Sequence, residues 1–132
     1  MSNDKTRILL VYEDGKASLE AVAGTIQSAI SKTHEVKLRL ASAVSIQEVL
    51  AADWYLFAVD EADSRAWREL RRLFKGINLA GRRAAFLSGE SGQAAMLREA
   101  FKDASLTTDE PDFLVQKNTN VAVWVQRVVA RT

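Results

Sequence analysis

The segment from Ile8 to Ala23 passes from an apolar run of strand length, through a short loop that contains Gly15, into a stretch with helical periodicity. A strand, a glycine loop and a helix in this order form the repeating unit of open α/β folds, and the amide groups that begin the helix attract anions. Apolar runs of strand length recur at residues 7–12, 36–40, 54–59, 83–87 and 113–115, with segments of helical period between them. This alternation predicts a parallel sheet with helices on both faces.

Several segments between and after these runs carry apolar faces at the spacing of an amphipathic helix. The faces consist of Leu19, Val22, Ala23, Ile26 and Ile30, of Leu97, Ala100, Phe101 and Ala104, and of Val121, Trp124, Val125 and Val128. The second of these helices is expected over residues 94–104 and the last over 120–131, with Asn118 or Thr119 as its N-cap. Five strands with intervening helices predict one α/β domain over residues 1–132, with the doubly wound strand order 2-1-3-4-5.

The composition narrows the classes of function. Hydrophobic residues make up 48% and charged residues 27% of the chain, and the net charge of +1 favours neither nucleic acid nor membrane as a partner. Because the chain has no cysteine, a disulfide, a thiolate nucleophile and an iron–sulfur cluster are excluded. No export signal or membrane span is visible, so we expect a cytoplasmic protein. The single histidine, His34, lies in a polar stretch, and neither a metal site nor a catalytic residue is predicted.

The first loop resembles that of flavodoxins, whose pattern after the strand's tyrosine runs x-S-x-T-G-N-T-E, where this chain has E-D-G-K-A-S-L-E. The resemblance to short-chain flavodoxins covers most of the chain. The segment from Glu35 to Ala62 looks like their second strand, short helix and third strand, and the segment from Asn78 to Ser88 resembles the turn and basic pair before their fourth strand. The resemblance implies a flavodoxin-like, three-layer α/β sandwich that is related to FMN-dependent electron carriers.

It also implies where a flavin would bind, at the loops that follow the first, third and fourth strands. The corresponding residues are Asp14, Gly15, Lys16, Ala17, Ser18 and Leu19 in the first loop, Asp60 and Glu61 in the second, and Ser88, Gly89 and Glu90 in the third. Asp14, Lys16 and Leu19 replace the hydroxyls that bind the FMN phosphate in the family. The second loop has no aromatic residue to stack on the flavin, and Glu90 lies near the position where a tyrosine commonly covers the ring. We therefore expect an eroded site with no FMN or weak FMN binding, in a small binding or regulatory module; the alternative is an FMN-dependent electron carrier.

A second alternative comes from receiver domains, which share this strand order and hold Mg²⁺ and a phosphoacceptor aspartate at the same loops. The matching residues here are Glu13, Asp14, Asp60, Ser88 and Lys117. Mg²⁺ is usually held by one or two carboxylates together with phosphate oxygens, so the chemistry is sound. The receiver lysine normally precedes a proline, whereas Asn118 follows here.

One charge cluster stands out, in a segment with helical period. Arg65, Arg68, Arg72 and Lys75 recur at spacings of three and four, which places them in one basic stripe. Such a stripe is either the solvated face of a helix or a docking surface for an acidic protein partner. Nucleic acid is not expected, because the net charge is near zero and no base-stacking motif accompanies the arginines.

Overall fold

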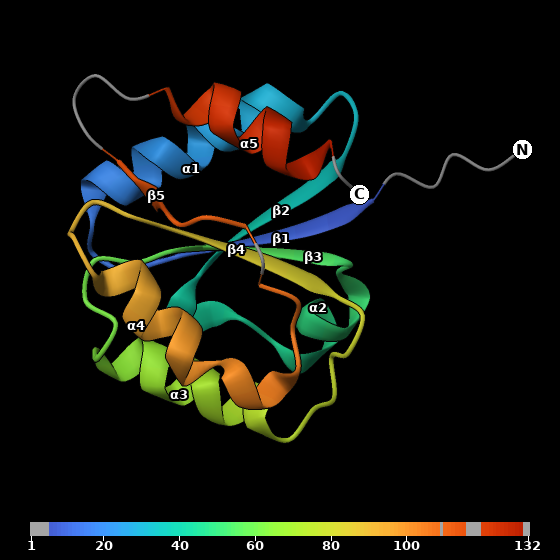
Figure 1. Cartoon of the computed structure of the whole chain (residues 1–132), viewed down its shortest axis with the longest axis vertical. Helices are drawn as coiled ribbons and strands as arrows, with labels where there is room; N and C mark the ends of the chain where they lie inside the picture. The colour runs from blue at the N-terminus through green and yellow to red at the C-terminus, as the bar shows by residue number, and fades with distance from the viewer. Residues whose placement is uncertain (1–5, 109, 116–119, 131–132) are drawn as a thin grey trace, which may run out of the picture.

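The computed structural model describes residues 6–108, 110–115 and 120–130. Its centre is a parallel sheet of five strands in the order β2-β1-β3-β4-β5, which confirms the predicted topology (Figure 1). The strands are β1 (Arg7–Tyr12), β2 (Glu35–Leu40), β3 (Trp54–Ala58), β4 (Arg83–Ser88) and β5 (Phe113–Leu114). The helices are α1 (Ala17–Ile30), α2 (Ile46–Ala51), α3 (Arg65–Lys75), α4 (Gln93–Ala100) and α5 (Val121–Val129), with short 3-10 turns η1 (Ala41–Ala43) and η2 (Lys102–Ala104).

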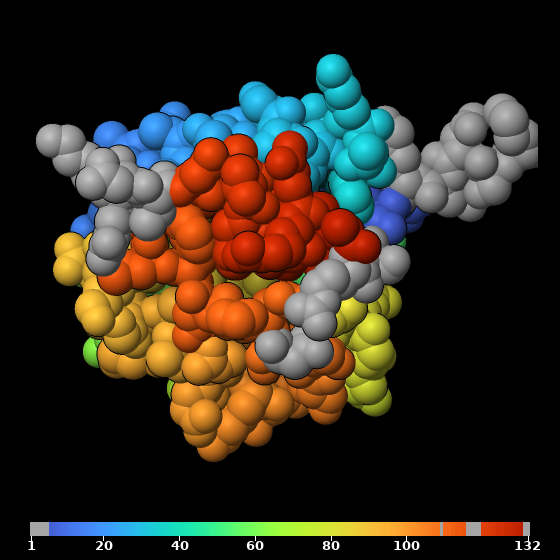
Figure 2. All heavy atoms as spheres, turned by 45° about the horizontal axis from the view of Figure 1, so that its top comes forward, coloured from blue at the N-terminus to red at the C-terminus, as the bar shows by residue number. Residues whose placement is uncertain are grey.

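The sheet separates two hydrophobic cores, because successive side chains of a strand point to opposite faces. On one face α1 and α5 pack side by side (Figures 1 and 2). They cover residues such as Leu10 and Leu56, and the Gln126 side chain of α5 donates to the Ala29 carbonyl of α1. On the other face, α2, α3 and α4 cover a core rich in aromatic side chains. Its six ring residues are Tyr55, Phe57, Trp67, Phe74, Phe86 and Phe101.

Three local expectations need correction. The apolar run expected at 36–40 belongs to β2, which has exposed and partly buried positions but no fully buried one, because it lies at the edge of the sheet. The helix expected over 94–104 ends at Ala100 and continues as η2. The last helix begins at Val121 with Asn120 as its N-cap, whose side chain accepts a hydrogen bond from the Val123 amide at 3.2 Å. The predicted caps Asn118 and Thr119 lie outside the described residues.

The central strands β1, β3 and β4 are buried almost throughout, and this rigid layer fixes the positions of the loops at its carboxyl end. None of the helices in the described part of the chain has the length and apolar character needed to cross a membrane.

Candidate functional site

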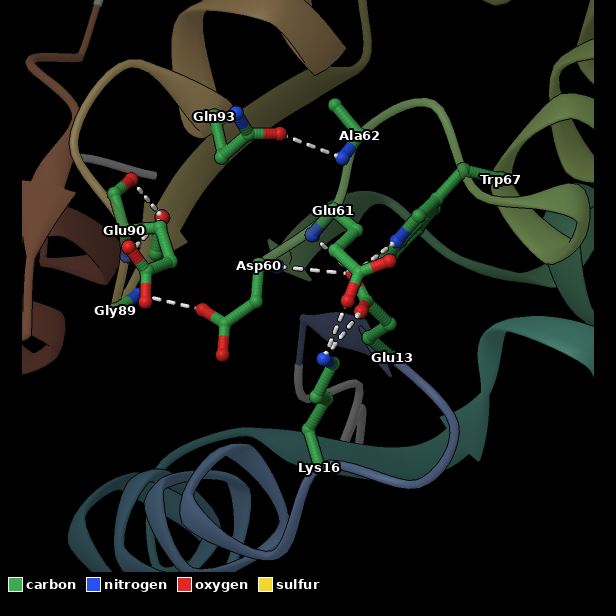
Figure 3. A network of polar contacts seen from close by, with 10 residues as sticks. Glu13, Lys16, Asp60, Glu61, Ala62, Trp67, Gly89, Glu90 and Gln93 are labelled. Carbon is green, nitrogen blue, oxygen red and sulfur yellow. Dashed lines mark hydrogen bonds and ion pairs between the residues drawn. The ribbon is translucent and has the colours of Figure 1, made fainter.

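Three loops meet at the carboxyl end of the sheet: the β1–α1 loop (residues 13–16), the β3–α3 loop (59–64) and the β4–α4 loop (89–92). The chain leaves β1 toward β2 on one side and leaves β3 toward β4 on the other, so the strand order reverses between β1 and β3. Open α/β folds bind their ligands at such a reversal. The candidate residues predicted from the sequence lie in these loops or directly beside them, in the first turn of α1 and at the end of β4. The structure brings the three loops together (Figure 3).

Glu13 is the centre of this region. Its side chain follows β1 directly and is 3% exposed. One carboxylate oxygen, Oε1, accepts hydrogen bonds from the Asp60 amide at 2.9 Å, the Glu61 amide at 2.8 Å and the Trp67 indole at 2.9 Å. Because buried N–H groups need partners, this carboxylate fixes the course of the β3–α3 loop.

Lys16 joins the β1–α1 loop to the β3–α3 loop. Its ammonium group donates to Glu61 Oε1 at 2.7 Å and lies 3.9 Å from Glu13 Oε2 (Figure 3). The hydrogen bond to Glu61 raises the pKa of Lys16, desolvation opposes the rise, and the charges of Glu61, Glu13 and Asp60 add to it. Lys16 is therefore charged at neutral pH and is engaged by the protein's own carboxylates.

The β3–α3 loop is also bonded to the elements that follow β4. Asp60 Oδ1 accepts from the Gly89 amide at 2.8 Å, and the Ala62 amide donates to the Gln93 side chain at 2.8 Å. A Cβ atom at Gly89 would lie 3.0 Å from Asp60 Oδ1, so glycine permits this close approach. These two bonds hold the second and third loops against each other.

The remaining candidates of the first loop face different surroundings. Asp14 accepts hydrogen bonds from the amide and the hydroxyl of Ser42 in η1, which ties the loop to the end of β2. Gly15 has φ +74°, a left-handed conformation that glycine adopts without strain. Ala17 and Ser18 are exposed in the first turn of α1. Leu19 is 1% exposed and belongs to the core beneath α1, so its side chain does not face the loops.

In the third loop, the Ser88 hydroxyl donates to the Glu90 carbonyl and accepts from the Glu90 amide. Ser88 is 2% exposed, whereas Gly89 and Glu90 lie at the surface. The buried hydroxyl of Ser88, which ends β4, thus has its hydrogen-bond partners in the backbone of the adjacent turn.

The described carboxylates of the receiver-like set face different partners. Glu13 faces the β3–α3 loop amides, Asp14 faces Ser42, and Asp60 accepts from the Gly89 amide. Within residues 6–108, 110–115 and 120–130, no three His, Cys, Asp or Glu side chains gather to hold a metal ion. Lys117, the lysine of that hypothesis, lies outside the described residues.

The roles of Ser42, Trp67 and Gln93 were missed from the sequence. Ser42 and Gln93 act through hydrogen bonds between segments far apart in the chain, which no local pattern encodes. Trp67 carried a usable signal, because a tryptophan on the apolar face of a helix needs a partner for its buried indole N–H. A carboxylate that follows a buried strand, as Glu13 does, is a natural candidate for that partner.

The chain resembles known proteins in structure, whereas comparisons of its sequence find no match. No family model matches the chain, and no curated protein matches its sequence at a significant level. A flavodoxin of Streptococcus pneumonia matches with a TM-score of 0.79 and 10% identity, over 96% of this chain and 100% of the other. A short-chain flavodoxin associated with a PDU bacterial microcompartment matches with a TM-score of 0.80 and 14% identity, over 96% and 98%.

A third match is a Fusobacterium nucleatum flavodoxin bound to flavin mononucleotide, with a TM-score of 0.71 and 10% identity over 95% of this chain and 98% of that one. At these identities the likeness concerns the fold, and the cofactor is a property of that protein. The chain has the flavodoxin-like α/β fold, with five parallel strands in the order 2-1-3-4-5.

Proposed function

We propose that this chain is a small flavodoxin-like binding or regulatory module in which contacts among the protein's own residues have replaced the FMN site. The observation that carries the proposal is the engagement of Lys16 and Glu13 with the β3–α3 loop, together with the bond from Gly89 to Asp60. The three loops that would surround a flavin are bonded to one another or to neighbouring elements. On this proposal the module does not carry electrons.

The donors and acceptors present do not fit FMN. A phosphate dianion needs N–H and O–H donors, but Asp14 brings a carboxylate, Leu19 is buried in the core, and the ammonium of Lys16 is already bonded to Glu61. Ser18 and the first amides of α1 remain as donors, which is consistent with weak anion binding at most. A charge-assisted hydrogen bond is worth about 1.5–3 kcal/mol. Losing two of them weakens binding by roughly two to four orders of magnitude.

The direct test is the colour and the FMN response of the purified protein. We expect colourless protein whose melting temperature hardly moves with excess FMN. A ligand at a hundred times its Kd stabilises a fold by about 2.7 kcal/mol, a shift of several degrees for a domain of this size. Protein that carries equimolar flavin, or that gains such a shift at micromolar FMN, would show that the site is functional.

A variant with hydroxyl groups in the β1–α1 loop tests the same proposal in the opposite direction. The double variant Asp14→Ser/Lys16→Thr restores two hydroxyls and removes the bond to Glu61 without touching the buried Leu19. We expect it to gain measurable FMN binding in a fluorescence-quenching titration. Glu99→Ser/Lys102→Thr is the matched control, because it removes an exposed ion pair of the same charges from α4 and η2. Equal FMN binding by both variants would sink the idea that the loop contacts exclude the flavin.

A further inference from the structure

The helices α3 and α4 lie on the sheet face opposite α1 and α5 (Figure 1). A groove runs between them. Its larger part is a cavity of about 140 Å³. A smaller hollow of about 10 Å³ lies beside it, and Arg71 and Ala100 line both parts. We call these two parts together the α3–α4 groove. Of the residues that bond the three carboxyl-end loops to one another, only Ala62 and Trp67 line the groove, and Asp63 of the β3–α3 loop lines it as well.

The groove has an apolar base and one exposed apolar side chain. Trp67, Leu97 and Phe74 are buried beneath it. Met96, on α4, is 52% exposed, which makes it one of the few large hydrophobic side chains at the surface of the described residues. An unbranched methionine adapts its shape to a partner's side chain, so Met96 suits a docking surface.

One flank of the groove is basic. Arg68, Arg71 and Lys75 are exposed and line it, and their spacing of three and four residues places them on one side of α3. None of the three forms an ion pair with another described residue within 4.0 Å. They therefore offer, along about 10 Å of helix, three cations that have no carboxylate partner among the described residues.

This geometry divides the basic stripe predicted from the sequence. Arg65 pairs with Glu69 at 3.0 Å, and neither Arg65 nor Arg72 lines either part of the groove. Arg71 was not assigned to the basic stripe, but it lines both parts of the α3–α4 groove. The groove and the outer side of α3 are thus distinct surfaces on one helix.

We propose that the α3–α4 groove docks an acidic amphipathic helix of a partner protein. An apolar side chain of that helix would pack on Met96, and carboxylates at matching helical spacing would face Arg68, Arg71 and Lys75. Asp63 and Asp103 line the two parts and repel acids there, so the partner's carboxylates are confined to the middle two turns. The proposal goes beyond the flavin question and does not depend on it, because the basic residues and Met96 that carry it lie on α3 and α4 and none of them was assigned to the flavin site.

The aromatic side chains argue for protein over nucleic acid. Trp67, Phe74 and Phe101 contribute to the groove lining but are each at most 2% exposed. Single-stranded nucleic acid gains much of its affinity from bases stacked on accessible rings. No ring lies exposed in the groove for such stacking.

The experiment is a selection from a displayed library of random 16-residue peptides, with wild-type protein as bait and the groove variant Arg68→Gln/Arg71→Gln/Lys75→Gln as counter-bait. We expect the enriched peptides to be acidic with apolar residues at helical spacing. The best peptide is then synthesised, labelled and titrated by fluorescence anisotropy. Its affinity should fall tenfold or more, about 1.4 kcal/mol, for the groove variant. It should also fall with Met96→Ser and with added salt.

The matched control is Arg65→Gln/Arg72→Gln, which removes two arginines from the same helix outside the groove and should bind the peptide as wild type does. Circular dichroism and melting curves confirm that every variant is folded. Three results would overturn the proposal: no enrichment over the counter-bait, a peptide that binds Met96→Ser as well as wild type, or a scrambled peptide of the same composition that binds equally well. Displacement of the peptide by a single-stranded oligonucleotide with higher affinity would assign the groove to nucleic acid instead.

Discussion

At the scale of single residues, the side chain of Glu13 holds the β3–α3 loop in place through hydrogen bonds. One buried oxygen satisfies two backbone amides and an indole N–H, and the same side chain lies near the ammonium of Lys16. A buried acceptor shared by three donors is expensive to remove, because every donor then loses its partner. The order of the β3–α3 loop therefore depends on a residue in another loop.

We expect Glu13→Ala to lower the free energy of unfolding by about 2–4 kcal/mol, since it leaves the Trp67 indole and two amides without an acceptor. Glu13→Gln keeps one acceptor oxygen and should lose less than half as much. Urea unfolding with equal m-values measures both. Glu20→Ala, an exposed glutamate of α1, is the control and should change stability by less than about 0.5 kcal/mol. A loss below 1 kcal/mol for Glu13→Ala would mean that water replaces the carboxylate freely.

At the scale of elements, α2 shows how a helix of less than two turns is held at the sheet edge. Ser45 and Glu48 form a reciprocal capping box, in which each side chain accepts a hydrogen bond from the other's backbone amide. Glu48 also pairs with Arg39 of β2 and lies 3.7 Å from Lys37. The cap therefore fixes both the start of α2 and its contact with the edge strand.

This cap should make part of the stability depend on pH. Burial raises the pKa of Glu48, but the hydrogen bonds from Ser45 and Arg39 and the charge of Arg39 outweigh it, so the pKa lies below its usual value. A lowered folded pKa contributes stability above the unfolded value of about 4.3 and loses it as the pH falls through the folded value. We expect the stability difference between wild type and Glu48→Gln to shrink when urea unfolding is repeated from pH 6 down to pH 3. A difference that stays constant over this range would show that the charge of Glu48 contributes nothing.

At the scale of the whole molecule, the strand order, the positions of the strands and the faces of the helices were predictable, because burial on both sides of a central strand leaves a long apolar run. The meeting of the three loops was predictable from the same order. Their mutual contacts were not: nothing local to Asp60 or Ser42 indicates that Gly89 or Asp14 will be its partner. The division of α3 into two surfaces could not be predicted either, because the spacing of Arg65, Arg68 and Arg72 carries no information on where α4 packs.

The two cores of the molecule should differ in their sensitivity to mutation. Phe57 is fully buried and its ring lies within 6.2 Å, centroid to centroid, of five others. Phe57→Ala should lower the free energy of unfolding by about 3–5 kcal/mol. Phe113, half-buried on the edge strand β5 against Trp124, is the control, and Phe113→Ala should cost about 1–2 kcal/mol. Urea unfolding of both variants checks the ranking, and equal losses would contradict it.

Trp67 gives this protein a built-in optical reporter. Its indole N–H bonds to Glu13 at the loop end, and its ring meets Phe57 edge-on at 6.1 Å. When Trp54 and Trp124 are replaced by phenylalanine, the remaining emission comes from one indole that is 1% exposed and bonded to a carboxylate. Any event that separates the loops would break that bond, admit water and shift the emission to longer wavelength. Opening of the carboxyl-end loops can thus be followed in real time without an added dye.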